Sequence, residues 1–337
     1  MGYSIYKNMC FKRKWWNMKC LYHYCSNEKG FSILKNKNLR MSDIGKSNDY
    51  EELQRFFPYL HRKIYDLYMK DPFDFKYESY TNTEAMREFL YSSEKYWRYR
   101  FEEGTFSNFV VCFSEAKDCL SQWRGYADDG KGVCIGFSKD ALTEFCKKTG
   151  GVLRFEKIIY ISEQELEEKI EQYAISILEN LRTLRGWIVE NMTFDDSDPK
   201  TDNLLGFNFD GLLECYFSES LKYKSVAFKE ESEWRIFLSK EAYKNPELVS
   251  KESDEMGIGP RDFLETTKFL NKKIEFWPTD RDLIPFYPLR FDEFNIKPVT
   301  ELWLGPKNLT REIDMKLFLA NEGYKDVKVK ISYISYR

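Results

Sequence analysis

The stretch from Leu21 to Ser42, LYHYCSNEKGFSILKNKNLRMS, decides which fold is expected of this chain. Its first residues are β-formers, the segment around Ile33 and Leu34 has helical spacing, and the last residues are extended again. The stretch therefore predicts a strand, a short helix and a second strand in immediate succession. His23 lies on the first strand between two tyrosines, a position more often filled by a structural histidine than by a functional one.

The middle and the end of the chain add further β-structure. Residues 109–114, 132–138 and 152–161 are rich in β-branched and aromatic types. The stretch "EWRIFLS" from Glu233 also predicts a strand, because Trp234, Ile236 and Leu238 alternate with the residues between them. A short helix is expected after Ser138, ending near Gly150, and later strands are expected over 284–291, 299–304 and 326–334. Because the strands come in groups rather than in strict alternation with helices, the α+β class is favoured.

Two helical blocks interrupt these strands, near residues 50–105 and 163–222. The second block opens with a capping box formed by Ser162 and Glu165, followed by an apolar stripe at helical spacing. We expect both blocks to be insertions in a single domain spanning residues 18–337. Residues 1–17 form a basic, aromatic extension that lacks the apolar run of a secretory signal.

Composition excludes several classes of protein. The chain has 52 basic and 55 acidic residues and a pI near 5.8, so a general electrostatic grip on nucleic acid is not expected. No apolar run approaches the roughly 18 residues of a membrane helix, so neither a membrane span nor a membrane partner is expected. Eight scattered cysteines and two histidines do not form a zinc site, and thiols such as Cys112 and Cys134 suit a reducing cytoplasm. Glycine-rich phosphate loops are absent from the sequence.

Two further segments carry residues of functional type. Trp123 and Tyr126 are three residues apart on a probable helix and share one face, which is most often a core pair. Glu231 and Glu233 precede an apolar strand on one face, with Trp234 turned into the core, an arrangement typical of a solvated strand edge.

The order of these segments resembles the motifs of the ADP-ribosyltransferase superfamily. In its histidine branch, a strand with hydrophobic-x-H-G-[ST] precedes I-L-x-x-G-L-R. Here His23 matches the histidine and Arg40 the arginine, whereas Tyr24 replaces the glycine and Asn38 stands where the turn glycine would be. Asparagine is a common substitute at a positive φ angle. The remaining matches to this motif are Ser26, Ile33, Leu34 and Leu39.

The other two segments match the superfamily's second and third motifs. Trp123 corresponds to the aromatic residue that stacks on nicotinamide, although Cys112 stands where a tyrosine is usual. Glu233 corresponds to the catalytic glutamate, and Glu231 to the acceptor-orienting glutamate of arginine-modifying enzymes. The resemblance implies a mixed, mostly antiparallel split β-sheet core of ADP-ribosyltransferase type with helical insertions, in which His23, Trp123 and Glu233 converge on one pocket.

The resemblance also implies a function, the cleavage of NAD by an ADP-ribosyltransferase or NAD glycohydrolase. NAD is then the substrate, the acceptor is a protein, a nucleic acid or water, and no metal is needed. Glu233 stabilises the oxocarbenium-like transition state, and His23 positions the dinucleotide. The expected ligand-binding residues are Trp123, Tyr126, Ser114, Arg40 and Ser42, with Glu231 orienting the acceptor.

A broader resemblance covers the chain from about Leu21 to its C-terminus. The sequence is similar to the bacterial domain-of-unknown-function family 2971, whose members often occur in mobile or defence-related contexts. This resemblance implies a bacterial defence or toxin-type effector, without defining its chemistry. The matching stretches are SNDYEE, CFSE, LSQWRGYAD, GVCIGF, ESEWRIF, ELWLGP and KISYISYR.

Two alternatives remain open at the level of sequence. In the first alternative, the chain is a catalytically inactive binding or regulatory module of the same fold. The replacements at Tyr24 and Cys112 favour this alternative. A weaker alternative is a magnesium-dependent nuclease. Its candidate carboxylates are Asp43, Asp49, Glu51, Glu115 and Asp118.

Overall fold

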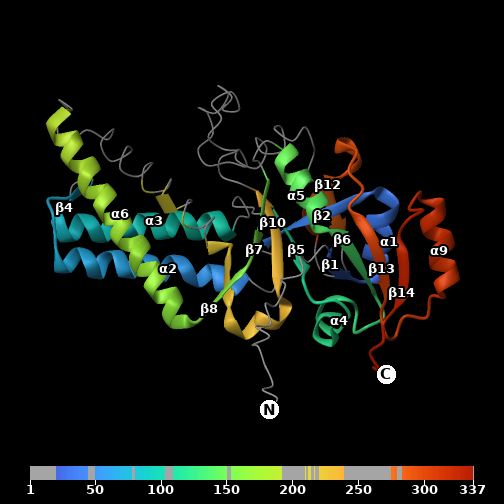
Figure 1. Ribbon diagram of the computed structural model, residues 1–337. Helices are drawn as coiled ribbons and strands as arrows, with labels where there is room; N and C mark the ends of the chain where they lie inside the picture. Colours follow the sequence, from blue (N-terminus) through green and yellow to red (C-terminus); the bar gives the residue numbers. More distant parts are fainter. Residues whose placement is uncertain are drawn as a thin grey trace, which may run out of the picture.

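The computed structural model describes most of the chain (Figure 1). The predicted extension 1–17 lies outside the described residues, as do most residues from 192 to 219 in the second predicted helical block. The described ranges are 20–44, 50–77, 80–102, 109–149, 153–191, 220–238, 275–278 and 283–336, together with 209, 212, 213 and 216.

Within these residues, ten strands form one sheet. Its main path runs β11-β12-β2-β5-β1-β6-β13-β14, and β10 joins β5 to β7. The β13–β14 pair is parallel and the other pairs are antiparallel, which confirms the expected α+β class with a largely antiparallel sheet. The ten strands are β1 (Cys20–Cys25), β2 (Asn38–Asp43), β5 (Phe109–Ser114), β6 (Val133–Ser138), β7 (Leu153–Lys157), β10 (Glu233–Leu238), β11 (Glu275–Pro278), β12 (Leu283–Arg290), β13 (Val299–Leu304) and β14 (Lys328–Ile331).

The sheet divides at β5, because this strand has three partners. β10 occupies one edge of β5 from Val110 to Ser114. The opposite edge is shared, since β2 pairs with it at Val110 and β1 pairs with it at Ser114. Between these two contacts β1 and β2 separate, and the split opens beside Cys112.

Small strands lie outside the main sheet. The predicted strand 152–161 is two strands, because the chain leaves β7 at Ile158 and continues as β8 (Ile159–Ile161), parallel to β9 (Tyr223–Ser225). A hairpin of β3 (Lys76–Tyr77) and β4 (Tyr80–Thr81) connects two long helices.

The helices agree with the predicted blocks. The first block contains α2 (Tyr50–Lys70) and α3 (Asn82–Glu102), and the second contains α6 (Glu163–Asn191). These three helices extend together to one side of the sheet (Figure 1). The shorter helices are α1 (Asn27–Asn36), α4 (Leu120–Tyr126), α5 (Lys139–Lys148) and α9 (Glu312–Asn321).

The predicted helix starts are confirmed at two serines. The hydroxyl of Ser162 accepts from the backbone N–H of Glu165, whose carboxylate accepts in return from the Ser162 backbone N–H. Ser138 caps α5 by accepting from the backbone N–H of Ala141. Each cap satisfies N–H groups that have no partner in the first helical turn.

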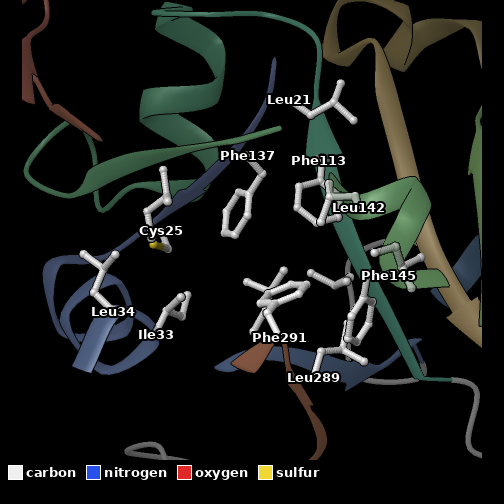
Figure 2. Close-up of a cluster of buried hydrophobic side chains, with 14 of the residues drawn as sticks. Leu21, Cys25, Ile33, Leu34, Phe113, Phe137, Leu142, Phe145, Leu289 and Phe291 are labelled. Carbon is white, nitrogen blue, oxygen red and sulfur yellow. The ribbon is translucent and has the colours of Figure 1, made fainter. Parts of the chain in front are cut away.

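The sheet is covered by apolar side chains on both faces, as strand alternation requires. On β10, Ile236 packs into one cluster and Phe237 into the other. The first cluster, shown in Figure 2, joins Phe113 and Phe137 of the sheet to residues of α1 and α5. The second joins the sheet to α2, α3 and α6, so the helical blocks are anchored on the face opposite that cluster.

Candidate functional site

A cavity of about 210 Å³ opens at the split between β1 and β2. Four of the residues expected to bind a ligand line it: His23 from β1, Arg40 and Ser42 from β2, and Tyr126 from α4. The sequence predicted that His23, Trp123 and Glu233 would converge on one pocket, and of these three only His23 lines this cavity. The other lining residues are Tyr24, Cys25, Lys29, Ile33, Trp277, Ile284 and Phe286.

His23 fills the gap that the split leaves beside β5. Its Nδ1 lies 2.9 Å from the carbonyl oxygen of Cys112. Because a carbonyl only accepts, Nδ1 carries the proton, and the neutral ring keeps Nε2 as an acceptor. Burial lowers the pKa of His23 below its ordinary value of 6.5, against the opposing effect of the Cys112 carbonyl. The imidazole is therefore neutral at pH 7.

The loop between α1 and β2 brings Arg40 to the cavity. Ser26 caps α1, and the helix ends at Lys37, which takes a left-handed conformation with φ of 52°. The expectation that Asn38 takes the positive φ angle was wrong, because Asn38 already belongs to β2. Gly30 lets α1 approach β6 closely, since a Cβ there would lie 2.3 Å from Cγ2 of Val133.

The guanidinium of Arg40 is held between aromatic rings. Its central carbon lies 3.8 Å from the ring centroid of Trp277 and 4.8 Å from that of Phe286. Nη2 donates to the hydroxyl of Ser32 at 2.7 Å, whereas Nε and Nη1 are buried without a hydrogen-bond partner among the described residues. Burial lowers the pKa of Arg40, although that value starts far above neutrality.

The two aromatic residues predicted on α4 have different environments. Trp123 is fully buried, packs edge-on against Tyr24 and donates its indole N–H to Asp118 at 2.8 Å. Its ring therefore presents no face to a ligand, in agreement with the core alternative. Tyr126 is 43% exposed and lines the cavity.

Glu231 and Glu233 belong to one ion-pair network that begins at Tyr126. The Tyr126 hydroxyl donates to Glu231 at 2.7 Å. The Lys224 ammonium donates to Glu231 at 2.6 Å and to Glu233 at 3.1 Å, and Arg235 donates to Glu233 at 2.6 Å. Glu231 is thus one hydrogen bond from Tyr126, which lines the cavity. Glu233 is connected to Glu231 only through Lys224.

The expectation that Glu233 lies at a solvated strand edge was wrong. Its side chain is 5% exposed, and β10 is paired on both edges, with β5 and with β7. Burial alone would raise the pKa of Glu233, but the charges of Arg235 and Lys224 outweigh it and hold the pKa below the ordinary 4.5. Glu231 lies in a 3-10 turn, Val226–Glu231, and the left-handed Ser232 between the two glutamates breaks the expected strand periodicity.

The two predicted serines also differ. Ser42 is exposed and lines the cavity. Ser114 is buried, and its hydroxyl donates to the Glu231 carbonyl at 2.5 Å and accepts from the backbone N–H of Ala116. Ser114 therefore fixes the turn that carries Glu231, and its hydroxyl is already in use.

Sequence analysis missed three residues of the site. Trp277 lies on β11, which pairs with β12. This strand has only four residues, too few to show a periodic pattern in the sequence. Lys29 lines the cavity from α1, where it resembles any exposed lysine. Lys224 is buried between two glutamates, and its position depends on the fold of β9.

Neither a metal site nor a membrane span is found in the described part of the chain. No cluster of three histidine, cysteine or carboxylate side chains is close enough to hold a metal ion there. Of the carboxylates considered for a nuclease, Glu115 accepts from Lys157 and Asp118 from Trp123. No described helix combines the length and apolar character needed to cross a bilayer.

Comparison with known proteins gives one match. Residues 122–236 match a family described as protein of unknown function (DUF2971). The match covers about a third of the chain, from α4 to β10, and includes Tyr126, Glu231 and Glu233 but not His23 or Arg40. No curated protein and no solved structure matches the chain.

Proposed function

We propose that the protein cleaves NAD between nicotinamide and ribose, transferring ADP-ribose to water or to another acceptor. The observation that carries the proposal is the convergence of His23, Ser42 and Tyr126 on one cavity at the split of the sheet. Glu231 is hydrogen-bonded to Tyr126 at the side of this cavity. A carboxylate at this position suits a reaction that develops positive charge.

Each side chain has a distinct part in the proposed reaction. The Nε2 atom of His23 accepts a hydrogen bond from a ribose hydroxyl and thereby orients the substrate. The Ser42 hydroxyl binds the carboxamide of nicotinamide. Tyr126 packs against the ligand and holds Glu231, whose charge stabilises the oxocarbenium-like transition state.

Glu233 supports this arrangement through Lys224. The sequence identifies Glu233 as the catalytic glutamate by motif, and this assignment stays a prediction. Because Glu233 faces two cations and Glu231 contacts a cavity residue, we assign the charge next to the substrate to Glu231.

The size of the cavity limits what it encloses. Its volume of about 210 Å³ lies below the roughly 300–1,000 Å³ of pockets that surround a drug-sized ligand. It accommodates one part of NAD, such as the nicotinamide ring and its adjoining atoms, and the rest of the dinucleotide extends past the rim.

Release of nicotinamide from NAD tests the proposal, with and without a chelator. We expect metal-independent release by the wild type and a rate about 10²–10³ lower for Glu231→Gln, as for the loss of one preorganised electrostatic contact. Glu230→Gln, at an exposed position of the same turn, is the matched control and should be unchanged. A folded wild type that releases no nicotinamide contradicts the proposal.

A second candidate is a binding module without catalysis. The observation that favours it is the neutralisation of Glu233 by Lys224 and Arg235. Such a module would bind NAD and leave it intact. Binding measured by calorimetry beside an absence of nicotinamide release would select this second function.

A further inference from the structure

The cavity at the split carries an unmatched positive charge. Arg40 and Lys29 both line it, and neither forms an ion pair with a described residue. The nearest carboxylates act on Arg40 only at longer range: Glu275 is paired with Arg290, and Glu28 is exposed on α1. His23 is neutral and adds no charge. The cavity therefore attracts anions.

Arg40 also has unused hydrogen-bonding capacity. Its Nε and Nη1 atoms are buried without a partner, although a buried donor without an acceptor costs free energy. These two atoms lie on different edges of the guanidinium, so a group with several oxygen atoms satisfies both better than a single carboxylate does. Buried donors that are left without an acceptor in this way are typical of a ligand-binding position.

We propose that Arg40, assisted by Lys29, forms a receptor for a phosphate or pyrophosphate group in this cavity. Trp277 covers a face of the guanidinium at 3.8 Å, so an anion bound to the in-plane Nε and Nη1 atoms lies beside the indole. Binding then changes the environment of an aromatic residue in the site. This anion site shares its cavity with the proposed NAD-cleaving function, but its test requires no NAD.

Calorimetric titration with sodium pyrophosphate at constant ionic strength tests the receptor. We expect binding by the wild type and affinity lower by about tenfold or more in Arg40→Met, because hydrogen bonds from a charged donor are lost. Arg311→Met is the matched control, since it removes the same charge from a residue that is paired with Asp314 outside the cavity lining. Equal affinity in the wild type and Arg40→Met, or no binding by the wild type, overturns the proposal.

Two further measurements separate a receptor from a structural arginine. Without anion, Arg40→Met should unfold at the same or a higher temperature than the wild type. Pyrophosphate should raise the midpoint of thermal unfolding of the wild type and of Arg311→Met only. A lower midpoint for Arg40→Met, with an equal shift in all three proteins, overturns the receptor. Sodium benzoate tests the ligand class, and affinity equal to that of pyrophosphate overturns the assignment to phosphate.

The outcome is distinguishable from that of the NAD assay. Arg40-dependent binding of pyrophosphate without nicotinamide release supports the anion site and rejects the catalytic proposal. Nicotinamide release without pyrophosphate binding supports the catalytic proposal and rejects the anion site.

Discussion

At the scale of single residues, the charge of Glu233 is the most constrained in the site. Its carboxylate compensates two cations that are themselves only 2% exposed. We expect Glu233→Gln to lower the free energy of unfolding by about 3–5 kcal/mol, because removing one partner leaves buried charge uncompensated. Urea unfolding measures the change. Glu230→Gln, on the exposed surface, should alter stability by less than about 0.5 kcal/mol.

The same residue gives a prediction for pH. The folded protein holds the pKa of Glu233 below 4.5, so its charge stabilises the fold above that pH and the contribution is lost as the pH falls through the folded pKa. The difference in unfolding free energy between the wild type and Glu233→Gln should therefore shrink as the pH is lowered below 4.5. A difference that stays constant from pH 7 to acid would show that another interaction carries the stability.

At the scale of elements, the start of α6 depends on one reciprocal pair of hydrogen bonds. Ser162→Ala removes the hydroxyl that caps the Glu165 N–H and should cost about 0.5–2 kcal/mol of unfolding free energy. Ser162→Asp keeps an acceptor at this position and should restore most of the loss. If both variants unfold like the wild type, the cap does not stabilise the helix.

The elements that the sequence predicts well are those with local causes. Caps at Ser138 and Ser162, the β-forming residues of β5 and the alternation in β10 are visible within about ten residues. The features of the site depend on distant chain segments instead. The environment of the buried Trp123, for example, includes Asp118, which also accepts a hydrogen bond from Ser332 near the C-terminus.

Long-range contacts also decide the electrostatics of the site. Motif order predicted that His23, Trp123 and Glu233 would share one pocket, but only His23 lines the cavity. No local pattern shows that Lys224 bonds both glutamates or that Trp277 covers Arg40. Periodicity failed at Glu231 because the left-handed Ser232 separates the turn from the strand. Such contacts form between residues that are far apart in the sequence and that strand pairing brings together. A short stretch of sequence therefore does not predict them.

At the scale of the whole molecule, the ion-pair network connects two cavities. Tyr126 lines the cavity at the split, whereas Lys224 and Arg235 line a second cavity of about 350 Å³ beside the start of α6. The network therefore runs from one cavity to the other. Because its members share partners, their substitutions should not act independently.

A double-mutant cycle on Lys224 and Glu231 measures this dependence. Lys224→Met leaves two carboxylates without their shared cation and should lower the unfolding free energy by about 3–5 kcal/mol. Adding Glu231→Gln removes one of these charges, so the double variant should be more stable than the sum of the single changes implies, by about 0.5–3 kcal/mol. Lys229→Met, at an exposed position of the same turn, is the control and should combine additively with Glu231→Gln. Additivity for Lys224 as well would show that the contacts seen between these side chains do not couple them, and that the two cavities are energetically separate.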